Sequence, residues 1–195
     1  MSQTEPDHLN VDQLPDSDIV RILVNQHDEI RELCKAMAVA MSSDQKAVIF
    51  DELRGLIAVH EAAEEAVVRP RTLITAGQDV VDRSNAEERA LTESLAELEA
   101  SVLDSADFDE KFAAFAEAIT DHIHAEEVYE FARLLKTSEP PERARLGAVF
   151  LKAERLVPDH AHPALAGSPA KQRMVAPFAT LLDRAKDAFT RLTEH

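Results

Sequence analysis

The segment DHIHAEE, residues 121–127, decides how this chain folds. His122 and Glu126 stand four residues apart, and side chains at that spacing lie on one face of an α-helix. The same arrangement occurs in VHEAAEE, residues 59–65, where Glu64 follows His60 by four residues. Each pair can present an imidazole and a carboxylate to one metal cluster, so the two segments predict a metal site inside a helical bundle.

A third histidine, His27 in NQHDEI (residues 25–30), stands in the middle of an apolar stripe with helical spacing. The stripe consists of Ile19, Val20, Leu23, Val24, Ile30 and Cys34. Cys34 is the single cysteine, which allows no internal disulfide, and we interpret it as core packing because free cysteine is usually buried.

Composition restricts the class of protein. The chain has 195 residues, of which 45% are hydrophobic, and only four glycines, which favours one mainly helical domain. A formal charge of −16 argues against nucleic acid or an anionic membrane as a partner, because both bind through Lys and Arg. No apolar run approaches the roughly 20 residues of a membrane span, and MSQTEPDHLN does not resemble a signal peptide, so the cytoplasm is the expected location.

Periodicity and capping residues predict an all-α, up-down four-helix bundle over residues 16–137. The four helices are expected from Asp16 or Ser17 to about Met41, from the Ser42–Asp44 cluster to a break at Arg69-Pro70, from near Val81 to Val102, and from Asp107 to about Lys136. Two starts for the third helix stay open. Either the stripe that begins at Val81 is helical throughout, or Ser84 and Glu87 form a capping box and the helix begins there.

The two ends of the chain differ from this bundle. Residues 1–15 are polar and contain two prolines, so they are expected to form a flexible tail. Residues 138–195 predict two further helices, Pro140 to about Leu156 and Lys171 to Leu192, joined by a loop. Two helices of this size cannot bury a sufficient core alone, so we expect them to pack on the bundle as a C-terminal extension.

Six polar side chains interrupt the apolar stripes of the four bundle helices. They are His27, His60, Glu64, Glu88, His122 and Glu126. Carboxylates are rarely buried unless they are paired or bind a metal, and no Lys or Arg stands at the matching level of these stripes. We therefore predict that all six are metal ligands, and that the neighbouring Glu87 points elsewhere.

The donor set indicates the metal. Six nitrogen and oxygen donors without a thiolate exceed one tetrahedral zinc and fit two first-row ions bridged by carboxylates. Iron is the first choice and manganese the second. Two further candidate ligands are His162, in the loop before the last helix, and Tyr129, the only tyrosine.

These motifs resemble the hemerythrin-like, or HHE cation-binding, family over about residues 17–137. His27, the His60–Glu64 pair and the His122–Glu126 pair match the family pattern, and the second glutamate of each Glu-Glu pair is expected outside the ligand set or facing solvent. The C-terminal segment is similar to the extension of some actinobacterial members.

The resemblance implies an oxo- or hydroxo-bridged di-iron centre that reacts with or senses O2, peroxide or NO, including catalase-like consumption of peroxide. The chain departs from the pattern where Glu88 replaces an expected histidine, with Ser84 one turn earlier. A third carboxylate should lower the reduction potential, which makes reversible O2 carriage less expected. The alternative is a module that binds or stores iron, or reports it to a partner, without catalytic turnover.

Overall fold

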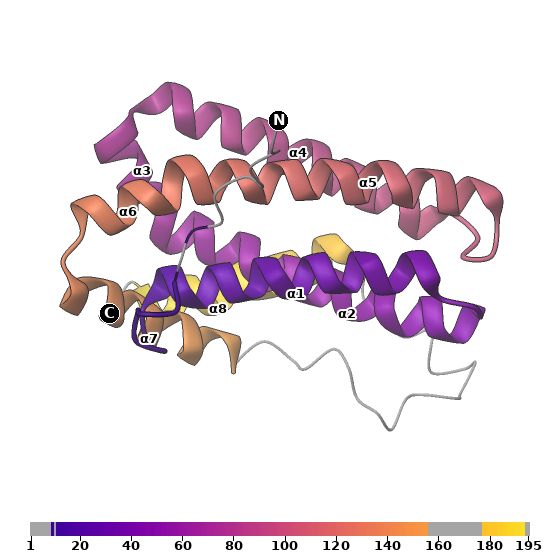
Figure 1. Ribbon diagram of the computed structural model, residues 1–195, viewed down its shortest axis with the longest axis horizontal. Coiled ribbons are helices and arrows are strands. Elements are labelled where there is room, and N and C mark those ends of the chain that lie inside the picture. The colour runs from indigo at the N-terminus through magenta and orange to yellow at the C-terminus, as the bar shows by residue number, and fades with distance from the viewer. Residues whose placement is uncertain (1–8, 10, 156–176, 194–195) are drawn as a thin grey trace, which may run out of the picture.

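A computed structural model describes residue 9, residues 11–155 and residues 177–193. Within these ranges every regular element is helical, so the predicted all-α bundle with C-terminal helices is confirmed. The elements are α1 (Ile19–Val39), α2 (Ser43–Ala63), α3 (Arg69–Ala76), α4 (Gln78–Ala100), α5 (Ala106–Ala125), α6 (Ala132–Thr137), α7 (Pro140–Glu154) and α8 (Phe178–Thr193). Figure 1 shows α4 and α5 in one layer above α1, α2 and α8. None of the described helices is long and apolar enough to cross a membrane.

Short polar residues begin the long helices, as predicted, but at slightly different positions. Asp18, rather than Asp16 or Ser17, caps α1 by accepting from the amide of Val20 at 3.1 Å. Ser42 caps α2, and Ser105 caps α5 two residues before the predicted Asp107. A helix boundary depends on which side chain reaches a free amide, and a cluster of candidate caps leaves that choice open.

Two π-helical turns interrupt the helices that carry the His-Glu pairs. The first, η1 (Glu64–Val68), joins α2 to α3, and the second, η2 (Glu126–Phe131), joins α5 to α6. Each begins at the glutamate of its pair. Such turns insert a residue into an α-helix and are frequent at functional sites.

The predicted break at Arg69-Pro70 is wrong, because the chain stays helical through η1 into α3. Proline is tolerated there because Pro70 lies in the first turn of α3, directly after the π turn, where the helical hydrogen-bond pattern changes from π to α. The turn instead comes at Gly77, whose φ of +92° requires glycine, and α4 starts at Gln78. Ser84 therefore lies inside α4, which excludes the capping-box interpretation.

Two hydrophobic clusters form the core. One gathers around Ile19, Leu23, Phe131 and Phe150, and the other around Leu53, Leu95 and Phe108. The C-terminal helix joins both clusters, through Phe189 in the first and through Phe178 and Leu181 in the second.

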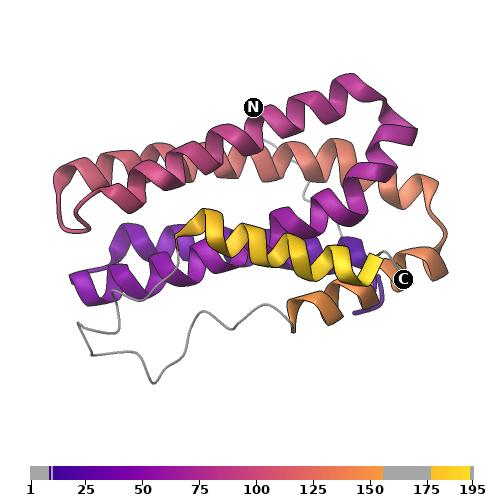
Figure 2. The ribbon, with the colours of Figure 1, turned by 180° about the vertical axis from the view of Figure 1, so that it is seen from behind.

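The C-terminal helices pack on the bundle. The most extensive contact of α8 is with α2, which Figure 2 shows from behind. On α7, Arg143 donates to Asp18 at 2.8 Å, so a residue of the C-terminal extension fixes the side chain that caps α1. Gly147 lies against the backbone of Ser17, where a Cβ atom would collide.

The described part of the N-terminal segment, which was predicted as a flexible tail, also packs on the core. Val11 is buried, and Leu9 and Leu14 lie against the first hydrophobic cluster. Arg21 on α1 donates to the carbonyl of Leu14 at 2.5 Å. The segment from residue 11 to α1 is therefore part of the folded unit.

Candidate metal centre

Four buried side chains from three helical segments converge in the first group of candidate ligands. His27 of α1, His60 of α2, Glu64 and Glu126 each offer an atom within 4.8 Å of the others. The two Nε2 atoms of His27 and His60 lie 3.0 Å apart, and Glu64 Oε1 lies 3.6 Å from His60 Nε2. The structure thus brings together four of the six predicted ligands.

A second group adjoins the first. Glu61, Glu88 and His122 also place one donor atom each within 4.8 Å of one another. Glu126 lies between the groups, because its Oε2 is 3.4 Å from His27 Nε2 while its Oε1 is 3.1 Å from His122 Nε2. One carboxylate therefore faces both groups with different oxygens.

A separate acceptor fixes the orientation of each histidine. His27 Nδ1 donates to Glu127 at 2.9 Å, His60 Nδ1 to Gln26 at 3.1 Å, and His122 Nδ1 to Glu87 at 3.2 Å. All three Nε2 atoms are left pointing at the cluster. This arrangement is typical of metal-binding histidines, whose second ring nitrogen is held by a carboxylate or an amide.

Several donor atoms have no hydrogen-bond partner among the described residues. They are Glu64 Oε1, His122 Nε2 and both carboxylate oxygens of Glu126, all buried. Burying such atoms without a partner costs about 1–3 kcal/mol each, and more for charged groups. A cation at these atoms would satisfy them, so the residues present fit a metal ion.

Without a metal, protons take the place of the cation on His27 and His122 but not on His60. Burial disfavours the charged form of His27, but the nearby carboxylates of Glu126 and Glu127 outweigh it and raise the pKa of His27. Burial lowers the pKa of His60 to about 4. For His122, burial is outweighed by the Glu126 carboxylate, which raises the pKa of His122 to about 9.

The carboxylates show the same competition for positive charge. Burial and the nearby Glu126 raise the pKa of Glu61 to about 7 and raise the pKa of Glu64 well above its usual range. Burial acts on Glu126 too, but the histidines around it hold the pKa of Glu126 well below its usual range. The cluster is thus short of positive charge.

The prediction that no inward Lys or Arg lies at this level is wrong. Arg69, buried at the start of α3, contacts Glu88 and lies 3.2 Å from Glu130 and 3.9 Å from Glu64. The sequence pattern missed it because the helix was expected to end at this residue. Glu88 therefore contacts the Arg69 guanidinium and also belongs to the second group of candidate ligands.

Of the two additional candidates, Tyr129 does not reach the cluster, and the structure does not describe His162. Tyr129 is 61% exposed, and its ring lies 5.9 Å from the guanidinium of Arg83, so the prediction that it is a ligand does not match its placement. A π-helical turn rotates Tyr129 away from the face expected for an α-helix. His162 lies outside the described residues. Of the two outer glutamates, Glu127 is buried against His27, while Glu65 is exposed and pairs with Lys186.

Sequence reasoning missed Glu61 and Gln26, and its prediction that Glu87 points elsewhere is wrong, because Glu87 bonds to His122. Gln26 follows Ile22 by four residues, and Glu61 follows Ile57 by four, so both lie at the edge of an apolar stripe. That spacing was an available signal. No comparable signal marked Glu87, because it reaches His122 across the gap between α4 and α5.

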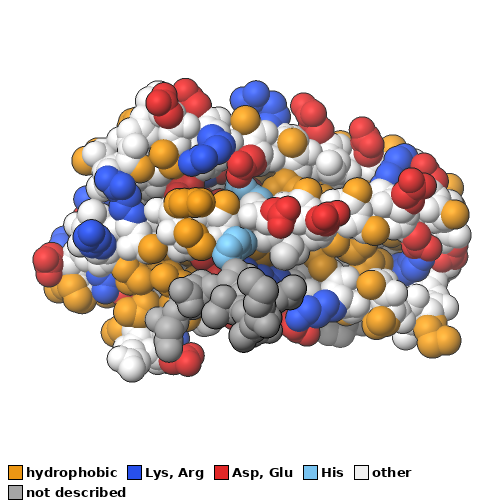
Figure 3. Space-filling view, turned by 45° about the horizontal axis from the view of Figure 1, so that its top comes forward, with side chains coloured by type: hydrophobic (Ala, Val, Ile, Leu, Met, Phe, Trp, Pro, Cys, Tyr) orange, Lys and Arg blue, Asp and Glu red, His pale blue; other side chains and the backbone are white. Residues whose placement is uncertain are grey.

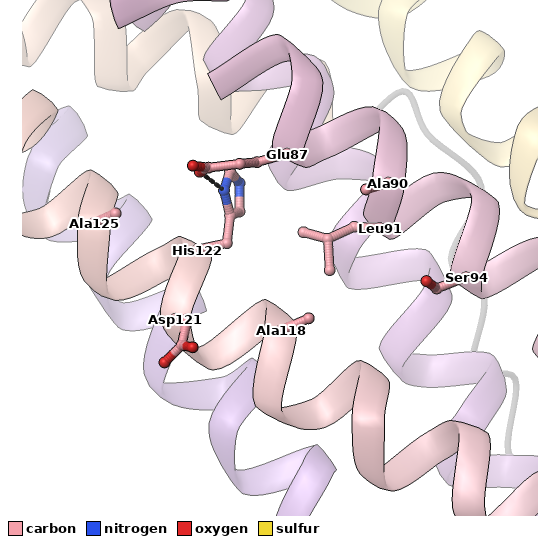
Figure 4. Close-up of a pocket in the computed structure, with 8 residues that line it drawn as sticks. All are labelled: Glu87, Ala90, Leu91, Ser94, Ala118, Asp121, His122 and Ala125. Atoms are coloured by element: carbon pink, nitrogen blue, oxygen red, sulfur yellow. Dashed lines mark hydrogen bonds and ion pairs between the residues drawn. The ribbon is translucent and has the colours of Figure 1, made fainter. Parts of the chain in front are cut away.

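A cavity of about 290 Å³ lies between α4 and α5 and ends at His122. Figure 4 shows its walls, which are formed mainly by Ala90, Leu91, Ala118 and Ala125, with Glu87 bonded to His122 at one side. Figure 3 shows the molecule with the top of Figure 1 turned forward, and histidine side chains, in pale blue, are visible near the middle of this face. A small neutral molecule could therefore approach the second group along an apolar wall.

Comparison with known proteins identifies the family. The family model described as the hemerythrin HHE cation-binding domain matches residues 18–134, more than half of the chain. The chain belongs to this family. No curated protein and no solved structure matches it significantly. The matched segment contains both groups of candidate ligands, and this hemerythrin-like domain has a cluster of histidines and glutamates that fits a metal site.

Proposed function

We propose that this hemerythrin-like protein holds two iron ions, one in each group, with Glu126 as the shared ligand. The observation that carries the proposal is the orientation of Glu126, whose two oxygens face His27 and His122 respectively. Manganese is the second choice for the same nitrogen and oxygen donors.

Charge balance supports two divalent ions. Seven buried or half-buried carboxylates surround the centre, and two guanidinium groups contact them. The carboxylates belong to Glu61, Glu64, Glu87, Glu88, Glu126, Glu127 and Glu130, and the guanidinium groups to Arg31 and Arg69. With every carboxylate ionised, seven negative against two positive charges leave an excess of five, and two divalent cations would neutralise four of them.

We further propose that the centre reacts with or senses small oxidants such as O2, peroxide or NO, with catalase-like consumption of peroxide as one possible outcome. Bound iron would supply reversible redox chemistry and a site for the small molecule. The apolar cavity at His122 admits a ligand of this size. The many carboxylates stabilise ferric iron and disfavour reversible O2 carriage.

Iron content after anaerobic ferrous loading tests the proposal. The wild-type chain is expected to retain two irons and to absorb in the near-ultraviolet and visible after exposure to air. Glu126→Gln, which keeps the shape but loses the charge, should retain at most one. Glu117→Gln is the matched control, because Glu117 is exposed on the same helix.

Peroxide consumption by the loaded protein then separates the two functional classes. Turnover that Glu126→Gln abolishes and Glu117→Gln preserves supports the reaction with oxidants. Two irons without peroxide consumption or NO binding would favour the iron-binding module. A wild-type chain with one iron or none would contradict the dinuclear centre.

A further inference from the structure

We propose that Arg69 competes with the second metal ion for Glu88, so that the two metal positions load in sequence rather than together. This inference rests on the dinuclear site proposed above. The inference adds that the two metal positions have unequal affinities and that Arg69 sets the difference.

The two groups differ in how their carboxylates are already engaged. In the first group, Glu64 Oε1 and both oxygens of Glu126 pair only with histidine nitrogens among the described residues, at 3.1–4.0 Å. In the second group, the Arg69 guanidinium contacts Glu88 Oε1. A cation in the first group meets no fixed positive charge at these oxygens, whereas a cation at Glu88 must displace a guanidinium that always keeps its charge.

Arg69 is anchored independently of Glu88. Its Nη1 lies 3.2 Å from Glu130 Oε1, and Glu130 also accepts from Thr72 at 2.7 Å and from Ser84 at 2.6 Å. The guanidinium can therefore give up Glu88 through Nη2 alone while Nη1 stays paired. Ser84, which stands where the family resemblance suggested a histidine, helps to hold this anchor.

Electrostatics adds to the difference between the positions. Arg69 keeps its charge at every physiological pH, so it repels a cation at the second group even after Glu88 is released. In the first group, Arg69 approaches only Glu64, at 3.9 Å from its Oε2, while Glu64 Oε1 faces His60 Nε2 at 3.6 Å. A chain at low iron is then mononuclear and becomes dinuclear only as iron rises, which makes the centre responsive to iron supply.

Anaerobic titration with ferrous iron, followed by calorimetry, tests this inference. The wild-type chain should bind in two steps, the second weaker by about tenfold or more. Arg69→Met should strengthen the second step by about tenfold to hundredfold and leave the first step almost unchanged. Arg71→Met is the matched control, since Arg71 lies on the same helix but pairs with Glu142 at the surface, and it should behave as wild type.

Two results would overturn the inference and leave the dinuclear site intact. These are equal affinities in the wild-type chain, or an Arg69→Met variant whose second step is unchanged or weaker. Absence of any iron binding would instead overturn the proposed function. If Arg69→Met does not remain helical, the wild-type titration and a Glu88→Gln variant test the inference instead. Glu88→Gln should lose the weak binding step only. Loss of both binding steps would contradict the assignment of Glu88 to the second position.

Discussion

In each histidine of the cluster, one ring nitrogen bonds to a protein acceptor and the other faces the candidate metal positions. Nδ1 donates to Glu127, Gln26 or Glu87, and Nε2 faces the candidate metal positions. Because Nδ1 is committed to its acceptor, Nε2 is the ring nitrogen left to bind a metal, and on His27 and His122 it does so by exchanging a proton for the metal. Preorganisation of this kind lowers the entropic cost of assembling ligands from separate helices.

Gln26→Leu tests this role of the outer acceptors. Removing the amide oxygen that holds His60 Nδ1 should weaken metal binding by about 10- to 100-fold while the helices stay intact. Gln26→Glu, which keeps an acceptor, should retain most of the affinity. Competition with a coloured chelator measures both variants, and equal affinities for Gln26→Leu and wild type would contradict the role.

The raised pKa of His122 predicts how the stability of the metal-free protein depends on pH. The pKa is about 9 in the folded chain against 6.5 for the free side chain, so the folded state binds the extra proton between these values. Stability is therefore fully present below pH 6.5 and is lost as pH rises to 9, by up to about 3 kcal/mol.

Urea unfolding at several pH values measures this dependence. His122→Gln should flatten the fall, and metal-loaded protein should show little of it, because the metal takes the place of the proton. An increase in the stability of the metal-free protein between pH 6.5 and 9 would contradict the assignment.

At the scale of the element, the π turns explain which parts of the site a sequence pattern can predict. The His-Glu pairs lie in regular α-helix up to Glu64 and Glu126, and there the four-residue spacing placed them correctly on inner faces. Beyond them the register shifts. Tyr129 lies within the second π turn and Arg69 directly follows the first, so an α-helical wheel does not apply to them, and both were predicted wrongly.

Deleting Val128 from the second π turn should close the turn into a continuous α-helix and shift the side chains within it, the last of which is Phe131. Phe131, fully buried and stacked on His27 with ring centroids 5.2 Å apart, would lose its place. We expect a loss of about 3–5 kcal/mol, comparable to truncation of a buried phenylalanine.

Val128→Ala is the control for this deletion, because it keeps the chain length at a side chain that is 40% exposed, and it should cost little. Chemical denaturation of the metal-free protein gives both values. A deletion variant as stable as the control would show that the turn is dispensable.

At the scale of the whole molecule, the C-terminal helices are part of the core although the family match ends at residue 134. The sequence predicted that they pack on the bundle from their small size alone. It could not show where they pack, because amphipathic periodicity names an apolar face but not its partner. The structure places α8 on α2 and ties α7 to the cap of α1.

Phe189→Ala tests whether the extension and the bundle unfold together. Phe189 is buried and lies 5.8 Å from Phe150, centroid to centroid. Its truncation should destabilise the entire protein by about 3–5 kcal/mol in one cooperative transition. Thr190→Ala, at an exposed neighbour, is the control. Two separate transitions, with the bundle unaffected, would show that the extension is an independent unit.

The contact between α2 and α8 also has a consequence for synthesis on the ribosome. The two helices begin at Ser43 and Phe178, and at about 5–20 residues per second the ribosome needs roughly 7–27 seconds to make the chain between them. Throughout that interval the face of α2 that contacts α8 has no cover, and the last residue of the two groups, Glu126, is translated 52 residues before Phe178. A nascent chain that captures iron early would thus gain a rigid bundle before its last helix arrives, and metal supply would reduce the time it depends on chaperones.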